Sequence, residues 1–63
     1  MANNDDLPFK IERWSEGYDQ PEETISMAGD YLSAKAAFEA AVKRRPREWI
    51  LLRQKARVIS KSI

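Results

Sequence analysis

Two short stretches near the start of the chain alternate apolar and polar residues at every second position. In the first, 9–14, Phe9 and Ile11 share one side of the backbone and charged residues take the other. A second stretch, 23–28, repeats the pattern. Alternation of this kind is typical of a half-buried strand. The segment between them, 15–22, is rich in turn-forming Gly, Asp and Pro, so the pattern predicts an antiparallel hairpin with a fairly long loop.

The spacing of apolar residues changes to three and four over 31–45. This stretch is rich in alanine and contains neither glycine nor proline, which favours a helix. Asp30 is a good N-cap, and Pro46 ends the helix because the residue before a proline avoids helical backbone angles. The sequence therefore predicts one amphipathic helix over 31–45. Its apolar stripe consists of Tyr31, Ala34, Phe38, Ala41 and Val42.

The last segment, 47–63, admits two interpretations. As a helix, it has apolar residues three and four apart, from Trp49 to Ile63. As strands, it has two short apolar runs, 49–52 and 57–60, with a turn at Gln54-Lys55. Periodicity slightly favours the helix. A two-stranded hairpin is only marginally stable by itself, however, and this favours two more strands beside the first hairpin.

The run AFEAAVKRRPREWILLRQKARVI resembles a group of short, mostly uncharacterised bacterial proteins. The resemblance implies a ββαββ layout and carries no known activity. Relatives often have glycine in the final turn, whereas this chain has Gln54-Lys55. Without glycine, a two-residue turn forces positive backbone angles on other residues, and a longer or bulged turn is the alternative. The matching residues are Ala37, Phe38, Ala40, Ala41, Pro46, Ile50, Leu52, Arg53, Arg57, Val58 and Ile59.

The predicted fold is α+β: a small antiparallel sheet with one helix packed on one face, in the order ββαββ. The alternative is a β-hairpin followed by a helical hairpin. Residues 1–7 are predicted to form a flexible acidic tail and residues 8–63 a single domain. We expect the helix to cover Phe9, Ile11, Ile25, Met27 and Leu51, which leaves Trp14, Ile50, Leu52 and Val58 on the other face.

Composition excludes several kinds of chemistry. The 63 residues include no Cys and no His, so disulfides, Cys/His zinc sites, thiolates and imidazole bases are ruled out. A glycine-rich phosphate loop is also ruled out, because the chain has only two glycines, far apart. The paired acids Asp5/Asp6 and Glu22/Glu23 lie in a tail and at the start of a strand, without the rigid support that catalysis needs. We expect a protein that is not an enzyme and binds no metal or cofactor.

No apolar run approaches the roughly 20 residues of a transmembrane helix. The start of the chain is polar and acidic, unlike a signal peptide. We therefore expect a soluble, cytoplasmic protein.

The net charge of +1 hides a strong asymmetry, since residues 1–34 carry −6 and residues 35–63 carry +7. The two halves either neutralise each other or provide a basic surface for an anionic partner. The basic residues gather around Pro46 and in the last segment. Trp49 lies nearby, although its place at the head of an apolar run favours a core or interface role over stacking on a base. The candidate anion or nucleic-acid patch comprises Lys43, Arg44, Arg45, Arg47, Arg53 and Arg57.

These features favour a small, non-enzymatic interaction or accessory protein. A sheet with one helix on one face leaves the other face for a protein partner or for self-association. The alternative is binding of an anion or nucleic acid through the basic cluster around Pro46. No nucleic-acid-binding signature supports that alternative.

Overall fold

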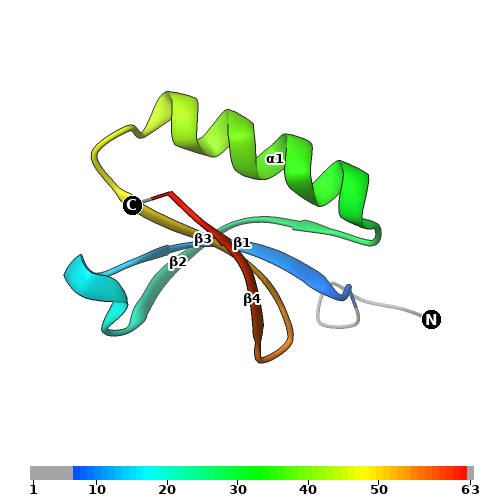
Figure 1. Cartoon of the computed structure of the whole chain (residues 1–63), viewed down its shortest axis with the longest axis horizontal. Helices are drawn as coiled ribbons and strands as arrows, with labels where there is room; N and C mark the ends of the chain where they lie inside the picture. Colours follow the sequence, from blue (N-terminus) through cyan, green and yellow to red (C-terminus); the bar gives the residue numbers. More distant parts are fainter. Residues whose placement is uncertain (1–6, 63) are drawn as a thin grey trace.

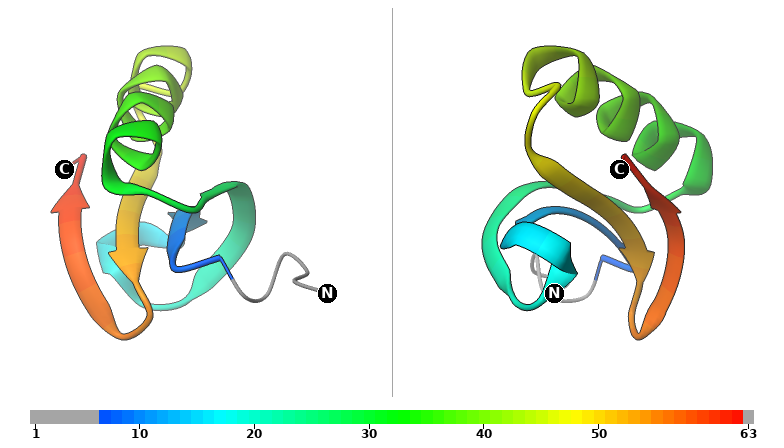
Figure 2. Two further views of the ribbon diagram at one scale, coloured as in Figure 1. Left: turned by 90° about the vertical axis from the view of Figure 1, so that its right-hand side faces the viewer. Right: turned by 60° about the vertical axis from the view of Figure 1, so that its left-hand side comes forward.

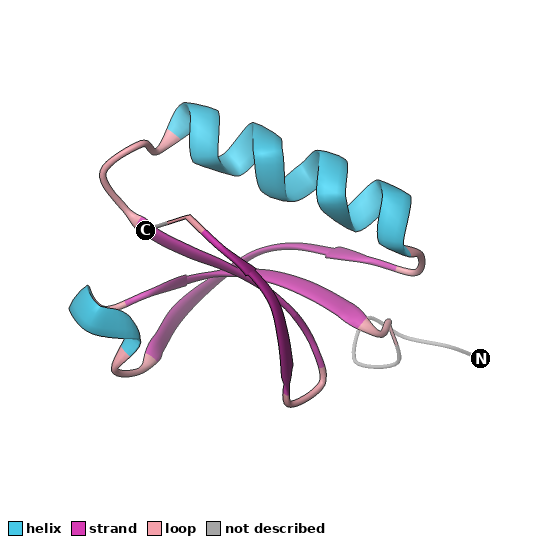
Figure 3. Cartoon of the chain, viewed as in Figure 1, coloured by secondary structure: helices cyan, strands magenta, loops and turns pink. Residues whose placement is uncertain are grey.

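The computed structural model describes residues 7–62 and has the predicted ββαββ order (Figures 1 and 3). The segment after Pro46 forms two strands, so the alternative of a helical hairpin is wrong. The elements are β1 (Phe9–Trp14), a short 3-10 helix η2 (Glu16–Tyr18), β2 (Pro21–Ala28), α1 (Tyr31–Arg44), β3 (Trp49–Gln54) and β4 (Arg57–Lys61).

The four strands form one antiparallel sheet in the order β2-β1-β3-β4. Strand β1 is central, with Ile11 opposite Ser26 on one side and Leu52 on the other. Pro8 therefore comes just before a central strand. The two edges of the sheet are β2 and β4.

Local signals account for the position of α1. The Asp30 carboxylate accepts a hydrogen bond from the backbone N–H of Ser33 at 2.8 Å and one from its hydroxyl at 2.9 Å. At the other end, the N–H of Arg45 donates to Ala41, and Pro46 follows. The helix thus begins as predicted and ends one residue earlier, at Arg44.

The core lies between α1 and one face of the sheet. Ile11, Ile50 and Leu52 are fully buried there, against the small residues Ala34 and Ala41 of the helix. Partly buried side chains complete it: Ile25, Ala37, Phe38, Val42 and Ile59.

This arrangement corrects the expected orientation of β3. Directly opposed residues of an antiparallel pair share a face, and Ile11 opposes Leu52. Leu52 and Ile50 therefore point toward α1, whereas Leu51 points away from it. Met27 also lies on the face opposite to the one we expected, because it opposes Lys10. A bulge near Ile25 separates the two parts of the β1–β2 register and leaves Ile25 packed on the core.

The final turn is tight even though it lacks glycine. Gln54 opposes Arg57, so the turn consists of Lys55 and Ala56, one residue later than predicted. Lys55 takes the positive φ that such a turn requires, at 54°. A bulge also occurs, between the partners of Leu52 and Arg53 in the β3–β4 pair.

Residues 1–6 of the predicted tail lie outside the described residues. Leu7, which we placed in the tail, is half-buried. No helix in the described part of the chain has the length and apolar character needed to cross a membrane.

Candidate functional site

The face of the sheet turned away from α1 carries polar and aromatic side chains. Side chains of β1 and β3 alternate between the two faces, so this set interleaves with the core. We call it the uncovered face, because among residues 7–62 only η2 packs over part of it. The register places these residues on it: Lys10, Glu12, Trp14, Trp49, Leu51, Arg53, Val58 and Lys61.

A buried ion pair between Glu12 and Arg53 occupies the uncovered face. Nε and Nη2 of Arg53 donate to the two Glu12 carboxylate oxygens at 2.7 and 2.9 Å, which is a bidentate arrangement. Trp14 Nε1 donates to the same carboxylate at 3.1 Å. Nη1 of Arg53 donates to the carbonyl of Lys55 at 2.6 Å. The Glu12 side chain is only 5% exposed, and these contacts account for both of its oxygens.

The ion pair sets the charge of Glu12. The hydrogen bonds from Arg53 lower the pKa of Glu12 below its ordinary value, more than burial raises it. The pKa of Arg53 is raised in turn by its hydrogen bonds to Glu12. Glu12 therefore stays ionised at neutral pH, although a carboxylate buried without such partners would favour the neutral form.

Three aromatic residues also lie on or over the uncovered face. Trp14 and Trp49 are opposed on neighbouring strands. The ring of Tyr18 meets Trp49 edge to face, with 5.0 Å between their centroids. The ammonium of Lys61 lies 5.2 Å from the centre of the Tyr18 ring, within the range of a cation–π contact.

The backbone around η2 holds Tyr18 in place. Gly17 and Tyr18 both have positive φ, at 75° and 59°, and this conformation is uncommon for a residue as large as Tyr18. The Tyr18 hydroxyl donates to the carbonyl of Ile50 at 3.1 Å and accepts from the N–H of Ser62 at 3.1 Å. These bonds tie the β1–β2 loop to β3 and to the end of β4.

The candidate basic patch does not form one surface. β3 leads away from Pro46, and therefore Arg53 and Arg57 lie at the opposite end of the β3–β4 hairpin from the helix terminus (Figure 1). Arg53 is paired with Glu12, and Arg57 is exposed. Near Pro46, three residues remain exposed, Lys43, Arg44 and Arg47, and the fourth, Arg45, enters an ion-pair network.

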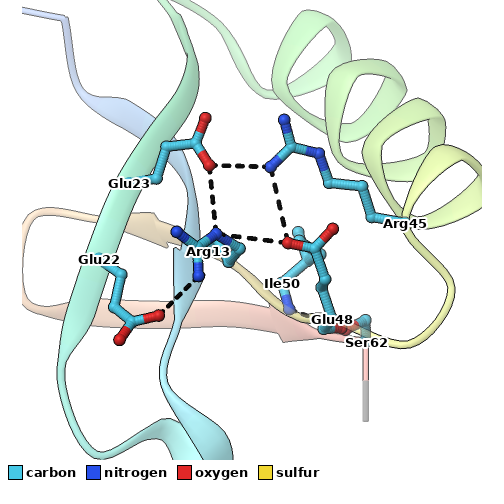
Figure 4. A network of polar contacts seen from close by, with 7 residues as sticks. All are labelled: Arg13, Glu22, Glu23, Arg45, Glu48, Ile50 and Ser62. Carbon is cyan, nitrogen blue, oxygen red and sulfur yellow. Dashed lines mark hydrogen bonds and ion pairs between the residues drawn. The ribbon is translucent and has the colours of Figure 1, made fainter.

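Figure 4 shows this network at the margin between the sheet and the end of α1. Arg13 lies 2.6 Å from Glu22, 3.2 Å from Glu23 and 3.3 Å from Glu48. Arg45 lies 2.9 Å from Glu23 and 3.8 Å from Glu48. Hydrogen bonds from Arg45 and Arg13 lower the pKa of Glu23. All these side chains are 31–42% exposed, so their pairing is solvated.

The network also bears on the charge asymmetry of the sequence. Among residues 7–62, two ion pairs join an acid of the acidic half to a base of the basic half: Glu12 with Arg53, and Glu23 with Arg45. Part of the asymmetry is therefore neutralised within the fold, which is one of the two explanations that the sequence offered.

The described residues give little support for acid–base or metal chemistry. Glu22 and Glu23 are both engaged by Arg13, and Asp5 and Asp6 lie outside the described residues. Within residues 7–62, no three or more Asp and Glu side chains come together in a way that would hold a metal ion.

Sequence reasoning missed two members of the uncovered face. Sequence analysis gave no role to Glu12, on the polar side of 9–14, or to Tyr18, within the loop 15–22. The alternation in 9–14 did place Glu12 and Trp14 on one side of β1, but it gave no sign that Arg53 would close over them. Nothing local indicated that Tyr18 would reach β3, because its partners lie more than thirty positions along the chain.

Comparison with known proteins does not assign the chain to a family. No family model matches the chain, and neither the curated proteins nor the solved structures include a significant match.

Proposed function

We propose that the protein is a non-enzymatic interaction module that binds a partner protein through the uncovered face. The observation that carries this proposal is the preorganised aromatic centre formed by Trp14, Tyr18 and Trp49. Trp, Tyr and Arg are the residues that most often dominate the binding energy of protein interfaces. Side chains already held by hydrogen bonds and ring contacts lose little conformational freedom on binding.

The charges of this face indicate the chemistry of the partner. Glu12 is neutralised by Arg53, whereas Lys10 and Lys61 lie on the same face without an acid of the described chain within ion-pair distance. The face is therefore positive around an aromatic centre. A complementary partner has an apolar patch with an acidic rim. A second copy of this chain would bring two positive faces together, which opposes self-association.

The absence of enzymatic activity is part of the same proposal. The sequence contains no His or Cys. The most buried acid among residues 7–62, Glu12, is held by three donors, whereas a general base needs a free lone pair and a pKa near the working pH.

Two variants with the same change of charge test the proposed binding face. Val58→Glu places a carboxylate on the uncovered face, where Val58 is 46% exposed. Leu32→Glu places one on α1, where Leu32 is 77% exposed. The immobilised wild type and both variants are incubated with extract of the source cells, with and without nuclease treatment. Retained proteins are then quantified at low salt and at roughly 0.5 M salt, where exposed charge pairs are largely screened.

We expect one protein to be retained by the wild type and by Leu32→Glu, and to fall about tenfold with Val58→Glu. Its retention should persist at the higher salt. Equal retention by all three chains would contradict the proposal. Binding that disappears with nuclease would instead assign the surface to nucleic acid, and retention of this chain itself would assign it to self-association.

A further inference from the structure

A second surface lies between β4 and α1, at the edge of the sheet. The helix packs on β1, β2 and β3, and β4 projects beyond it (Figure 2). A groove of about 780 Å³ separates α1 from the end of β4. Its lining includes apolar Phe38 and Val42 from the helix, and Lys43, Lys61 and Ser62 at its rim.

The outer side of β4 offers main-chain groups for pairing. β4 is an edge strand, so one row of its N–H and C=O groups faces away from β3 and has no strand partner among residues 7–62. Extended segments bind such edges as an added strand, with alternate side chains entering neighbouring pockets. At β4, one row of side chains from an added strand would face the groove that contains Phe38 and Val42.

We propose that the β4 edge and this groove bind an extended acidic segment of a partner protein as a fifth strand. The charges around the edge favour an acidic segment. β4 begins with Arg57 and ends with Lys61, and Lys43 lies across the groove from Lys61. Among residues 7–62, the only acid that lines the groove is Glu39.

A second copy of this chain fits the edge poorly. If β4 pairs with another β4 so that all its residues are matched in antiparallel register, Arg57 faces Lys61 at both ends. Like charges directly opposite each other destabilise a strand pair. The other edge, β2, begins with Pro21, and its pairing with β1 shifts register twice. Its acids Glu22 and Glu23 are already paired with arginines.

This proposal is independent of the proposed function, because the groove lies on the helix side of the sheet and not on the uncovered face. Lys61 belongs to both surfaces, whereas Phe38, Val42 and Lys43 line the groove alone, so a change at Lys43 tests the groove without altering the uncovered face.

The test uses capped synthetic peptides about as long as β4 and the full-length chain. One peptide alternates glutamate with valine. A second replaces glutamate by glutamine, and a third carries N-methyl groups on alternate amides, which removes half of its hydrogen-bond donors. Each is titrated into isotopically labelled protein, and the shifts of the backbone amides give the site and the dissociation constant.

Neighbouring residues of α1 supply a matched pair of variants. Lys43 and Arg44 are both exposed cations in the last turn of the helix. Lys43 lines the groove beside β4, whereas Arg44 lines a separate hollow on the β2 side. Lys43→Glu and Arg44→Glu therefore cause the same change of net charge in the last turn of the helix. The first does so on the β4 side and the second on the β2 side.

We expect the glutamate peptide to shift amides in 57–62 and near Phe38 and Val42. Affinity should fall about fivefold with Lys43→Glu and remain unchanged with Arg44→Glu. The glutamine and N-methylated peptides should bind more weakly. The proposal is overturned by no binding at millimolar peptide, by shifts elsewhere, by equal effects of the two variants, or by equal binding of all three peptides. Concentration-dependent broadening of β4 amides without peptide would also overturn it, since a second copy would then occupy the edge.

Discussion

The two faces of the sheet bury neighbouring residues by different means. On the covered face, Leu52 is fully buried beneath α1, against residues that the helix holds in place. On the uncovered face, Leu51 is 2% exposed and Glu12 is 4% exposed, with no α-helix above them among residues 7–62. Glu12 is shielded by long side chains that bond to its carboxylate, those of Arg53 and Trp14. Burial on this face therefore depends on contacts between side chains, which adjust more easily than a packed helix.

The largest expected effect is a difference in stability between two variants at adjacent positions, one on each face of the sheet. Leu52→Ala removes a side chain from the rigid core and should lower the free energy of unfolding by about 3 kcal/mol. Leu51→Ala removes the same atoms beneath adjustable side chains, so the cavity should partly close and the loss should be about half as large. Urea unfolding followed by tryptophan fluorescence measures both values. Equal losses would show that the two faces are equally rigid.

The second prediction concerns the ion pair. Arg53→Met leaves the Glu12 carboxylate buried without its main partner and should cost about 2 to 3 kcal/mol at pH 7. Adding Glu12→Gln to this variant should recover most of the loss, because no buried charge then remains. Arg57→Met, at an exposed cation of the same hairpin, should change stability by less than about 0.5 kcal/mol. If the double variant is no more stable than Arg53→Met, the ion pair is not what makes Arg53 important.

A third prediction follows from the pKa of Glu12. Its folded-state pKa is lowered from an ordinary value of 4.5, so the folded state binds its proton less readily than the unfolded state does. Glu12 therefore contributes stability at pH above 4.5, and that contribution is lost as the pH falls through its folded pKa. Glu23 and Asp30 act in the same direction. In Glu12→Gln, the fall in urea midpoint between neutral and acid pH should be smaller than in the wild type. An equal fall of the urea midpoint in the two chains would contradict the lowered pKa of Glu12.

The smallest effect is expected at the final turn, which belongs to neither face. Lys55 has φ of 54°, a conformation that glycine adopts without strain. Lys55→Gly should therefore raise the free energy of unfolding by about 0.5 to 1 kcal/mol. The hydrogen bond from Nη1 of Arg53 should persist, because its acceptor is the main-chain carbonyl of Lys55. Ala56→Gly, at a residue without positive φ, is the control and should not stabilise the chain. A loss of stability in Lys55→Gly would show that the turn is not strained.

The sequence predicted the elements whose signals are local. Asp30, the alanine-rich stretch and Pro46 together define α1, and the alternation over 9–14 defines β1. The orientation of β3 was wrong because 49–52 is uniformly apolar, and its pattern does not distinguish one face from the other. Only pairing with β1 decides that Leu52, and not Leu51, faces the helix.

The candidate site was harder to predict for the same reason. The cations from Lys43 to Arg57 are close in sequence, and the length of β3 separates them in space. Arg53 is drawn to Glu12, which lies on β1, far away along the chain. The order of the strands, with β1 between β2 and β3, brings these two residues together, and no local pattern reports that order.

The most direct test of the division between the two faces is to measure side-chain accessibility with a soluble paramagnetic gadolinium chelate. Methyl and indole signals of the full-length chain are recorded with and without the chelate at two protein concentrations. We predict strong attenuation at Val58 and at the Trp49 indole, protection at Ile11, Ile50 and Leu52, and no dependence on protein concentration. Protection of Val58 and Trp49 that grows with concentration would contradict the account, because a second copy would then cover the face that we assign to a different partner.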